Sequence, residues 1–333
     1  MSSPDVFAAA LAALEAGRGV AIATVIGAHG STPRHLGARM AIAADGETWG
    51  TIGGGRIEQV VVERAKEVAA GEAPAIVRQH LVRDLAMCCG GSMEIALTPA
   101  TGSRAALHAL VGSKAPQVLV TPLDGGKLLV RSPREGDPAP HQPAIRDGAL
   151  VERMGAVERA IVFGLGHVAR SLGPVLAGLG FTVIICDDGE TGAIAKPGWA
   201  AQLVESFDAV EVERVLGGFC ADDYVLVITR DHAIDQRLLE TLITRDTIGY
   251  LGMIGSRGKV GRFRKRLEAR GLLEGPEGEA RWARLRAPIG FDIGAETPEE
   301  IAVAIAAELV ARRRRGTSTP GSWAHARHHG ENA

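Results

Sequence analysis

The stretch that decides the fold of the second half of the chain is RAIVFGLGHVARSLGPVLAGLGFTVIICDDGE, residues 159–190. It begins with an apolar run, passes through a glycine-rich turn into a segment with helical spacing of apolar residues, and ends with a second apolar run that meets two acids. Strand, turn, helix and strand in this order build parallel sheets with helices on both faces. The stretch therefore predicts a Rossmann-like domain.

Three residues of this stretch match the dinucleotide-binding fingerprint. Gly164 and Gly166 open the helix in the pattern G-x-G-x-x-A, and Asp187 ends the next strand. Glycines at such a turn let backbone N–H groups and the helix N-terminus meet a pyrophosphate, and the acid can bind a ribose hydroxyl. Such glycines also occur where they serve only the turn, so whether NAD(P) or another nucleotide binds stays open.

Two further stretches, residues 223–243 and 247–267, repeat the strand, loop and helix pattern. They add parallel strands to the same sheet. Their loops, TRDHAID (229–235) and GSRGK (255–259), follow the strands at the carboxyl edge of the sheet, where folds of this type bind ligands. His232 in the first loop is therefore a candidate binding residue.

The fold class expected for the 333 residues is α/β, with an N-terminal α+β domain followed by a Rossmann-like domain with a parallel sheet. The last element of that domain is a predicted helix, which begins with Thr297 as N-cap and Glu300 completing a capping box. We expect four segments in this order: the N-terminal domain over 1–100, a less regular connecting subdomain and linker over 101–156, the Rossmann-like domain over 157–315, and a disordered tail over 316–333.

The composition excludes several classes of function. The net charge is −2 and aromatic residues make up 4% of the chain, so we expect no surface for nucleic acid or an anionic membrane. No apolar run approaches the roughly 18 residues of a membrane span, and the first residues lack the basic region of a signal peptide. The four cysteines have neither metal-site spacing nor the density of a disulfide framework, which favours reduced thiols in the cytoplasm.

A run of three glycines, Gly53, Gly54 and Gly55, lies in GTIGGGRIE (50–58), immediately before a helix that begins near Arg56. Consecutive glycines free the backbone to turn several N–H groups toward an anion, and the helix dipole adds to the attraction. The Lys-Ser/Thr pair of a Walker A loop is absent. The alternative is an ordinary strand-to-helix turn, which is the more frequent use of such glycines.

Two arginines, Arg34 and Arg39, lie in or beside the polar loop of GAHGSTPRHLGARM (27–40). Guanidinium groups suit bidentate capture of phosphate or carboxylate, so the arginines and the glycine run are candidates for one anion site. The alternative is a solvated basic pair.

Cys88 and Cys89 lie with Gly90 and Gly91 in MCCGGSMEI (87–95), in a predicted loop between two strands. Adjacent cysteines are poor candidates for a disulfide with each other, because its geometry is hard to reach from neighbouring Cα atoms. Thiolates favour soft metals, and the glycines would let a ligand approach the backbone without meeting a Cβ atom. A thiolate at neutral pH requires a lowered pKa. The alternative is an inert loop thiol.

Seven motifs in this order resemble one known family, the xanthine dehydrogenase accessory proteins of the XdhC/CoxI type. The motifs are GSTPR, GTIGGGRIE, CCGGSMEI, VFGLGHVA, TRDHAID, YLGMIGSRGK and APIGFDIGAETPEEIAVAIAAEL. The resemblance spans roughly residues 10–311 and implies an N-terminal domain with the glycine and CGG motifs, followed by a C-terminal Rossmann domain.

Matched by position, the family's CGG and glycine-loop motifs fall on Cys89, Gly90, Gly91, Gly53, Gly54 and Glu58. The resemblance places Cys89 near the molybdenum of a bound cofactor, with Cys88 as an additional thiol beside it. Arg230 stands where a histidine is expected after the threonine of the Rossmann motif, so the role of that loop is open in this chain, although Asp231, His232 and Asp235 fit.

The resemblance implies a chaperone for the molybdenum cofactor, which is molybdopterin with its molybdenum. Such proteins protect the cofactor while its terminal oxo ligand is exchanged for sulfur, then pass it to an apo molybdenum hydroxylase such as xanthine dehydrogenase. The expected partners are that hydroxylase and a cysteine desulfurase, and the expected assembly is a homo-oligomer, with a dimer favoured. No catalytic residue is expected.

Two other functions stay open from the residues. The Rossmann half alone would suit an NAD(P)-dependent oxidoreductase, which needs an acid or base near the nicotinamide. A purely structural assembly factor would bind protein and no small molecule. A test for bound pterin in the purified protein separates the three functions.

Overall fold

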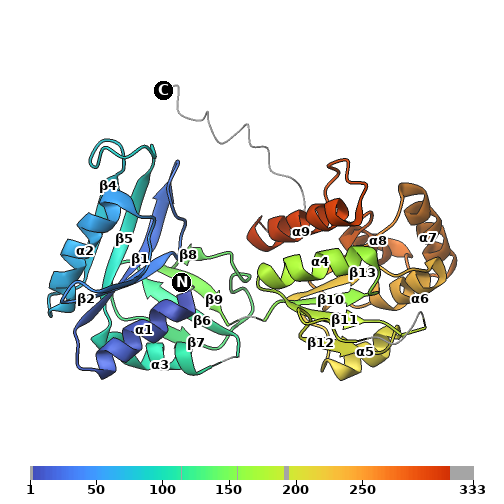
Figure 1. The fold of residues 1–333 in the computed structure, drawn as a ribbon, viewed down its shortest axis with the longest axis horizontal. Coiled ribbons are helices and arrows are strands. Elements are labelled where there is room, and N and C mark those ends of the chain that lie inside the picture. Colours follow the sequence, from blue (N-terminus) through green and yellow to red (C-terminus); the bar gives the residue numbers. More distant parts are fainter. Residues whose placement is uncertain (1–2, 114, 156, 191–194, 316–333) are drawn as a thin grey trace. The chain divides into compact units, whose positions relative to one another are not determined.

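The computed structural model describes residues 3–113, 115–155, 157–190 and 195–315. The chain divides into two compact units, residues 1–156 and 157–333 (Figure 1). The tail over 316–333, expected to be disordered, lies outside the described residues.

The first unit joins two antiparallel sheets. A five-stranded sheet has the order β3-β2-β1-β5-β4, and a four-stranded sheet has the order β7-β6-β9-β8. The elements are α1 (Ser3–Glu15), β1 (Val20–His29), β2 (Arg39–Ala43), β3 (Thr48–Gly50), α2 (Gly55–Ala69), β4 (Ala75–His80), β5 (Ser92–Pro99), the 3-10 turn η1 (Thr101–Ser103), α3 (Arg104–Gly112), β6 (Gln117–Pro122), β7 (Leu129–Arg131), β8 (Ala144–Arg146) and β9 (Ala149–Met154).

The central strand β1 is buried on both faces because successive side chains point to opposite sides. Ala23 and Val25 pack in the cluster that also holds the apolar stripe of α2. Val20 and Ile22 pack in a second cluster with residues of α1, α3 and the four-stranded sheet. The five-stranded sheet therefore has a helical layer on each face.

The segment 101–156 differs from the connecting subdomain and linker expected from the sequence. It contributes α3 and the four-stranded sheet to the first unit, and Leu107, Leu119 and Leu128 are buried in the same cluster as α1. Arg39 of β2 forms an ion pair with Glu152 of β9, which links the two sheets. The structure therefore has one boundary, after residue 156.

The second unit is a parallel six-stranded sheet of order β12-β11-β10-β13-β14-β15. Numbered within this unit, the order is 3-2-1-4-5-6, that of dinucleotide-binding folds, which confirms the predicted Rossmann-like domain. The elements are β10 (Arg159–Phe163), α4 (His167–Gly178), β11 (Thr182–Cys186), β12 (Gln202–Val204), α5 (Ala209–Val215), β13 (Asp223–Val227), α6 (His232–Leu242), β14 (Tyr250–Met253), α7 (Arg257–Ala269), α8 (Gly275–Arg284), β15 (Leu285–Arg286) and α9 (Pro298–Arg315).

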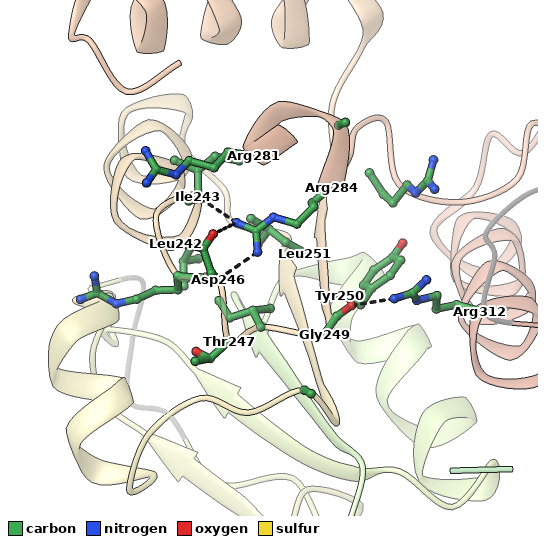
Figure 2. Close-up of a pocket in the computed structure, with 15 residues that line it drawn as sticks. Leu242, Ile243, Asp246, Thr247, Gly249, Tyr250, Leu251, Arg281, Arg284 and Arg312 are labelled. Atoms are coloured by element: carbon green, nitrogen blue, oxygen red, sulfur yellow. Dashed lines mark hydrogen bonds and ion pairs between the residues drawn. The ribbon is translucent and has the colours of Figure 1, made fainter. Parts of the chain in front are cut away.

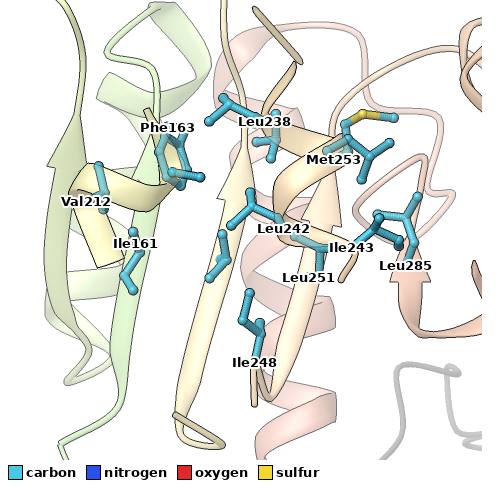
Figure 3. Packing of buried hydrophobic residues seen from close by; sticks show 14 of the residues in the cluster. Ile161, Phe163, Val212, Leu238, Leu242, Ile243, Ile248, Leu251, Met253 and Leu285 are labelled. Carbon is cyan, nitrogen blue, oxygen red and sulfur yellow. The ribbon is translucent and has the colours of Figure 1, made fainter. Parts of the chain in front are cut away.

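Helices cover both faces of this sheet. Ile161 and Phe163 of β10 pack into the cluster shown in Figure 3, together with Leu238 and Leu242 of α6. The alternate residues of β10 face the other side, where α4 and α9 pack. The capping box of α9 is as predicted, because the Glu300 amide donates to Thr297 Oγ1 at 3.3 Å and the Thr297 amide to Glu300 Oε2 at 3.0 Å.

Candidate functional site

Three loops of the first unit meet beside the N-terminus of α2. The Gly91 amide donates to the Ser31 carbonyl at 3.0 Å, which joins the CGG loop to the loop that holds Arg34. A Cβ atom on Gly53 would lie 2.6 Å from the Pro33 side chain, so the glycine run packs against the same loop. A Cβ atom on Gly55 would lie 3.3 Å from the end of Met87. The structure therefore brings the three N-terminal motifs together.

The glycines at this junction fall into two groups. Gly91 is fixed by packing, since a Cβ atom there would lie 2.3 Å from the His29 carbonyl oxygen. Gly54 has a φ of +75°, which favours glycine, but nothing lies within 4 Å of its Cβ position. Gly90 has neither a left-handed φ nor a neighbour within 4 Å of that position. Nothing that the structure describes requires Gly90 to lack a side chain, whereas a ligand that approaches the backbone would.

The amides of the glycine loop already bind an anion, which is the carboxylate of Glu58. Glu58 Oε1 accepts from the amides of Ile52, Gly53 and Gly54 at 2.9, 3.1 and 2.9 Å, and from the Thr51 hydroxyl. Burial alone would raise the pKa of Glu58, but these hydrogen bonds outweigh it and the pKa lies below its ordinary value. The expectation that Gly53 and Gly54 offer free N–H groups to an external phosphate is wrong for these amides.

The two arginines of the neighbouring loop differ in their surroundings. The side chain of Arg39 is 1% exposed, pairs with Glu152 and donates to the Gly37 carbonyl at 3.0 Å, so it is a structural residue and not an anion ligand. Arg34 is exposed, and no described acid pairs with it. Arg56, in the first turn of α2, is exposed as well. Among the residues that the structure describes at this junction, Arg34 and Arg56 are exposed cations without an acid partner.

The two cysteines are both free thiols, and they differ in exposure. Cys88 is exposed, whereas Cys89 is half-buried and packs against the core cluster under α2. Partial burial and the neighbouring Cys88 raise the pKa of Cys89 above its ordinary value. The surroundings of Cys89 therefore do not lower the pKa of its thiol, and Cys88 is the more exposed of the two.

A resident metal has no closed set of ligands at this site. The residues placed by the structure contain no group of three or more His, Cys, Asp or Glu side chains positioned to hold a metal ion. The two thiols could each meet a metal that arrives already bound to another ligand.

The fingerprint residues of the second unit form a separate group at the carboxyl edge of its sheet. Gly164 has a φ of +112°, and a Cβ atom there would lie 2.3 Å from the Ile228 carbonyl oxygen. Gly166 is the exposed N-cap of α4, with nothing within 4 Å of its Cβ position. The geometry of the glycine turn is therefore intact.

The acid of the fingerprint is occupied by the protein itself. Asp187 Oδ2 accepts from the Leu165 amide at 2.9 Å and Oδ1 from the Gly189 amide at 3.1 Å, and the side chain is 9% exposed. Arg230 lies 4.0 Å from Asp187 Oδ1 and donates to Asp188 and Glu190 at 3.0 Å each. A ribose hydroxyl would have to share Asp187 with these partners.

His232 is exposed at the first position of α6, where Asp231 caps the helix through the amides of Ala233 and Ile234. Among the described residues, no side chain lies in hydrogen-bond contact with the imidazole to form a binding site with it. Its position at the carboxyl edge of the sheet is as predicted, while its role stays a prediction.

The sequence reasoning missed a buried ion pair at the same edge. Lys259 Nζ of α7 lies 2.5 Å from Asp235 Oδ2 of α6, with side chains 6% and 1% exposed, and Thr229 donates to Asp235 Oδ1 at 2.6 Å. The signal was present, because Asp235 lies on the apolar stripe of α6, four residues before Leu239, and Lys259 lies four residues before Phe263. The pair joins the TRDHAID and GSRGK loops.

The helices that the structure describes include none long and apolar enough to cross a membrane.

Known families match both units. The XdhC and CoxI family model matches residues 13–80, and the XdhC Rossmann domain model matches residues 160–309.

Two curated relatives share 29% identity with the chain. One is the uncharacterized protein YqeB of Escherichia coli (strain K12), aligned over 297 residues, 87% of this chain and 43% of the relative. The other, from Bacillus subtilis (strain 168), is named as a probable subunit of xanthine dehydrogenase and aligns over 176 residues, 50% of this chain and 46% of the relative. The chain thus spans less than half the length of these relatives.

The fold has also been seen before. A crystal structure described as a xanthine dehydrogenase from Bacillus halodurans superposes with a TM-score of 0.67, over 96% of this chain and 98% of that one, at 22% identity. With models for both of its units matching in the expected order, the chain belongs to the XdhC and CoxI family.

Proposed function

We propose that this chain is an accessory protein that binds the molybdenum cofactor at the junction of the three N-terminal loops and delivers it to an apo molybdenum hydroxylase of the xanthine dehydrogenase kind. The observation that carries the proposal is Gly90. This glycine has an ordinary backbone conformation and open space at its Cβ position, and it lies beside two free thiols. A ligand that closely approaches this backbone would explain the missing side chain.

The chemistry of the junction suits the parts of this cargo. Molybdopterin carries a phosphate, a flat pterin and a soft, dithiolene-bound metal. The exposed Arg34 and Arg56 are cations for the phosphate, and the exposed Cys88 is a soft donor for the metal end. The carboxylate of Glu58 already accepts the hydrogen bonds of the glycine-loop amides, so the phosphate would be bound by guanidinium groups and not by that loop.

The family and the relatives support the coarser part of the proposal. The name of the Bacillus subtilis relative and the description of the Bacillus halodurans structure both refer to xanthine dehydrogenase, which suggests a hydroxylase of that kind as the partner. A role in the cytoplasm, a cysteine desulfurase as sulfur source and a homodimer belong to the same proposal.

An NAD(P)-dependent oxidoreductase is the less favoured function. Asp187 already accepts two backbone N–H groups, and Arg230 bridges the acids beside it. Binding and transfer of a cofactor need no proton-transfer pair, so the accessory role is the one we propose.

Gly90→Ala tests the binding site. A methyl group there meets nothing in the protein, so melting should be unchanged, whereas cofactor retained after gel filtration should fall about tenfold, or roughly 1.4 kcal/mol. Retention is measured by the fluorescence of the oxidised pterin. Gly112→Ala is the matched control, because that glycine also has open space and an ordinary φ. Equal retention in both variants would contradict the proposed site, because the cofactor would then bind elsewhere or not at all.

Delivery needs its own experiment. Loaded chain is mixed with a purified apo hydroxylase, and recovery of hydroxylase activity is compared with that from free cofactor. Faster or more complete recovery from the loaded chain is expected. Retention without any gain in delivery would leave a cofactor-binding protein and reject the chaperone role.

A further inference from the structure

A cavity of about 460 Å³ lies in the second unit at the amino ends of β13, β14 and β15, opposite to the fingerprint. Its lining includes Gly249 and Tyr250 where β14 begins, the turn that follows α6, the end of α8, and the C-terminal part of α9 (Figure 2). This volume falls within the usual range for small-molecule sites, roughly 300–1,000 Å³. The ligand crevice of dinucleotide-binding folds lies at the other edge of the sheet.

The charge of this cavity is strongly positive in a chain whose net charge is −2. One acid, Asp246, is among the lining residues. The basic lining residues are Arg245, Arg281, Arg284, Arg286 and Arg312. Glu213, which is outside the lining, pairs with Arg245 at 2.9 Å. Even with Glu213 counted, the guanidinium groups around this hollow outnumber the carboxylates.

Three of the arginines, Arg245, Arg284 and Arg312, have structural duties as well. Arg284 donates to the Ile243 carbonyl at 3.2 Å and to Asp246 at 2.7 Å, and Arg312 donates to the Gly249 carbonyl at 3.2 Å (Figure 2). Cations at the ends of helices are favourable because they meet unpaired carbonyl groups. These contacts hold the guanidinium groups in fixed positions around the turn between α6 and β14.

Structural duties do not explain the other two arginines of the lining. Among the residues that the structure describes, no acid pairs with Arg281 of α8 or Arg286 of β15. Like charges that gather on a concave surface repel one another, and a bound polyanion would remove that repulsion. Guanidinium groups are planar forks that match phosphate oxygens two at a time.

We infer that this cavity binds a small organic molecule that carries two or more phosphate groups. The arginines would hold the phosphates, and Leu251 and Ile248 give the cavity apolar lining beside them. The inference is independent of the cofactor site in the first unit, because it rests only on residues of the second.

Titration calorimetry with the full chain tests the inference. The probes are ADP, inorganic pyrophosphate and hexaglutamate, each with the unaltered protein and with two double variants. Arg281→Gln with Arg286→Gln removes the two arginines without an acid partner, and folding should persist because neither makes a described ion pair. Arg262→Gln with Arg266→Gln is the control, since both arginines are exposed on α7 outside the cavity and the loss of charge is the same.

Saturable binding of ADP and pyrophosphate is expected, weakened at least tenfold by the cavity variant and less than twofold by the control. No binding of either phosphate compound would overturn the inference, as would an equal loss in both variants. Binding that survives the cavity variant would place the phosphate elsewhere, for example at the fingerprint glycines. Tighter binding of hexaglutamate than of pyrophosphate would assign the cavity to an acidic protein segment and overturn the small-molecule inference.

Discussion

At the scale of single residues, the most informative side chain is Glu58, because it supplies the negative charge that a glycine loop is expected to take from a ligand. Its folded pKa is lowered by hydrogen bonds from Thr51 and three amides that outweigh burial. A carboxyl group with a depressed folded pKa stabilises the protein above its unfolded pKa, near 4.5, and loses that contribution as the pH falls through the folded value.

Glu58→Gln should therefore destabilise the first unit by about 1–2 kcal/mol at pH 7, a range kept modest because the carboxylate is partly exposed to screening by water. The difference from the unaltered protein should shrink below about pH 4.5. Urea unfolding at several pH values measures it. Glu63→Gln, an exposed change on the same helix, should cost less than about 0.5 kcal/mol throughout. A loss for Glu58→Gln that does not vary with pH would contradict the role of its charge.

The two thiols should react at different rates. Cys88 is exposed, whereas Cys89 is half-buried with a raised pKa, so iodoacetamide at pH 7.5 should label Cys88 several times faster. Labelling of Cys89 should accelerate as the pH rises, because a larger fraction of its thiol is then ionised. Peptide mass spectrometry separates the products, and Cys88→Ser provides the reference rate for Cys89 alone. Faster labelling of Cys89 at pH 7.5 would show that the loop opens in solution.

Sequence reasoning located the loops but not the partners of their charged residues. The glycine run, the CGG motif and Arg34 lie in three loops that meet, but amides of the glycine run bind Glu58. The partner of Arg39 is Glu152, more than a hundred residues away, and no local pattern announces such a pairing. Glu58 is close to the loop in sequence. The loop amides turn toward its carboxylate, however, in a backbone with positive φ values at Gly53 and Gly54, which the sequence does not reveal.

At the scale of elements, α6 and α7 are joined by the buried pair of Asp235 and Lys259. Removing one partner leaves an uncompensated buried charge, so Lys259→Met should cost about 3–5 kcal/mol. The double change of Asp235→Leu with Lys259→Met should recover most of that loss, because two apolar side chains replace the pair. The free energy of unfolding is measured from the urea transition of the second unit.

Arg257→Met is the matched control for that cycle. It removes an exposed arginine of the same helix, α7, from a pair with Asp292 at 3.5 Å, and exposed pairs contribute about 0–1 kcal/mol. A single change at Lys259 that costs no more than this control would show that the buried pair is dispensable.

The longer elements were predictable because their apolar periodicity is strong, as in β10, α4 and α9. The two-residue strand β15 and the three-residue strand β12 were not, since a segment of that length has no readable period. α8 was missed because glycine, proline and charged residues dominate its sequence, and only Gly278 is buried.

At the scale of the whole molecule, the second unit has the strand order of a dehydrogenase domain, yet we expect no dehydrogenase turnover. Each oxygen of Asp187 already accepts a backbone N–H, and Arg230 lies beside it. Incubation with NADH or NADPH and small aldehydes or ketones should give no loss of nicotinamide absorbance above that of a heat-denatured control. Steady turnover that disappears in Asp187→Asn would contradict this expectation.

The division into units was only partly predictable. The Rossmann-like half was evident from its alternating strands and helices, whereas the segment 101–156 was expected to be a connecting subdomain and linker. Its strands β7 and β8 are three residues long, and four prolines lie between Ser132 and Ala144. This segment packs against the first sheet because its apolar side chains are buried by residues far away in the sequence. A local sequence pattern does not show such contacts.

The ion pair of Arg39 and Glu152 decides how the chain should be cut for experiments on isolated fragments. A fragment that stops near residue 100 would keep Arg39, whose side chain is 1% exposed, and lose the carboxylate that neutralises it. The same cut would strip Leu107, Leu119 and Leu128 from their places against α1 and leave that apolar surface open to aggregation. A fragment that ends at residue 156 keeps both the ion pair and the apolar packing, and is therefore the piece with which to test whether the first unit alone retains the proposed cofactor.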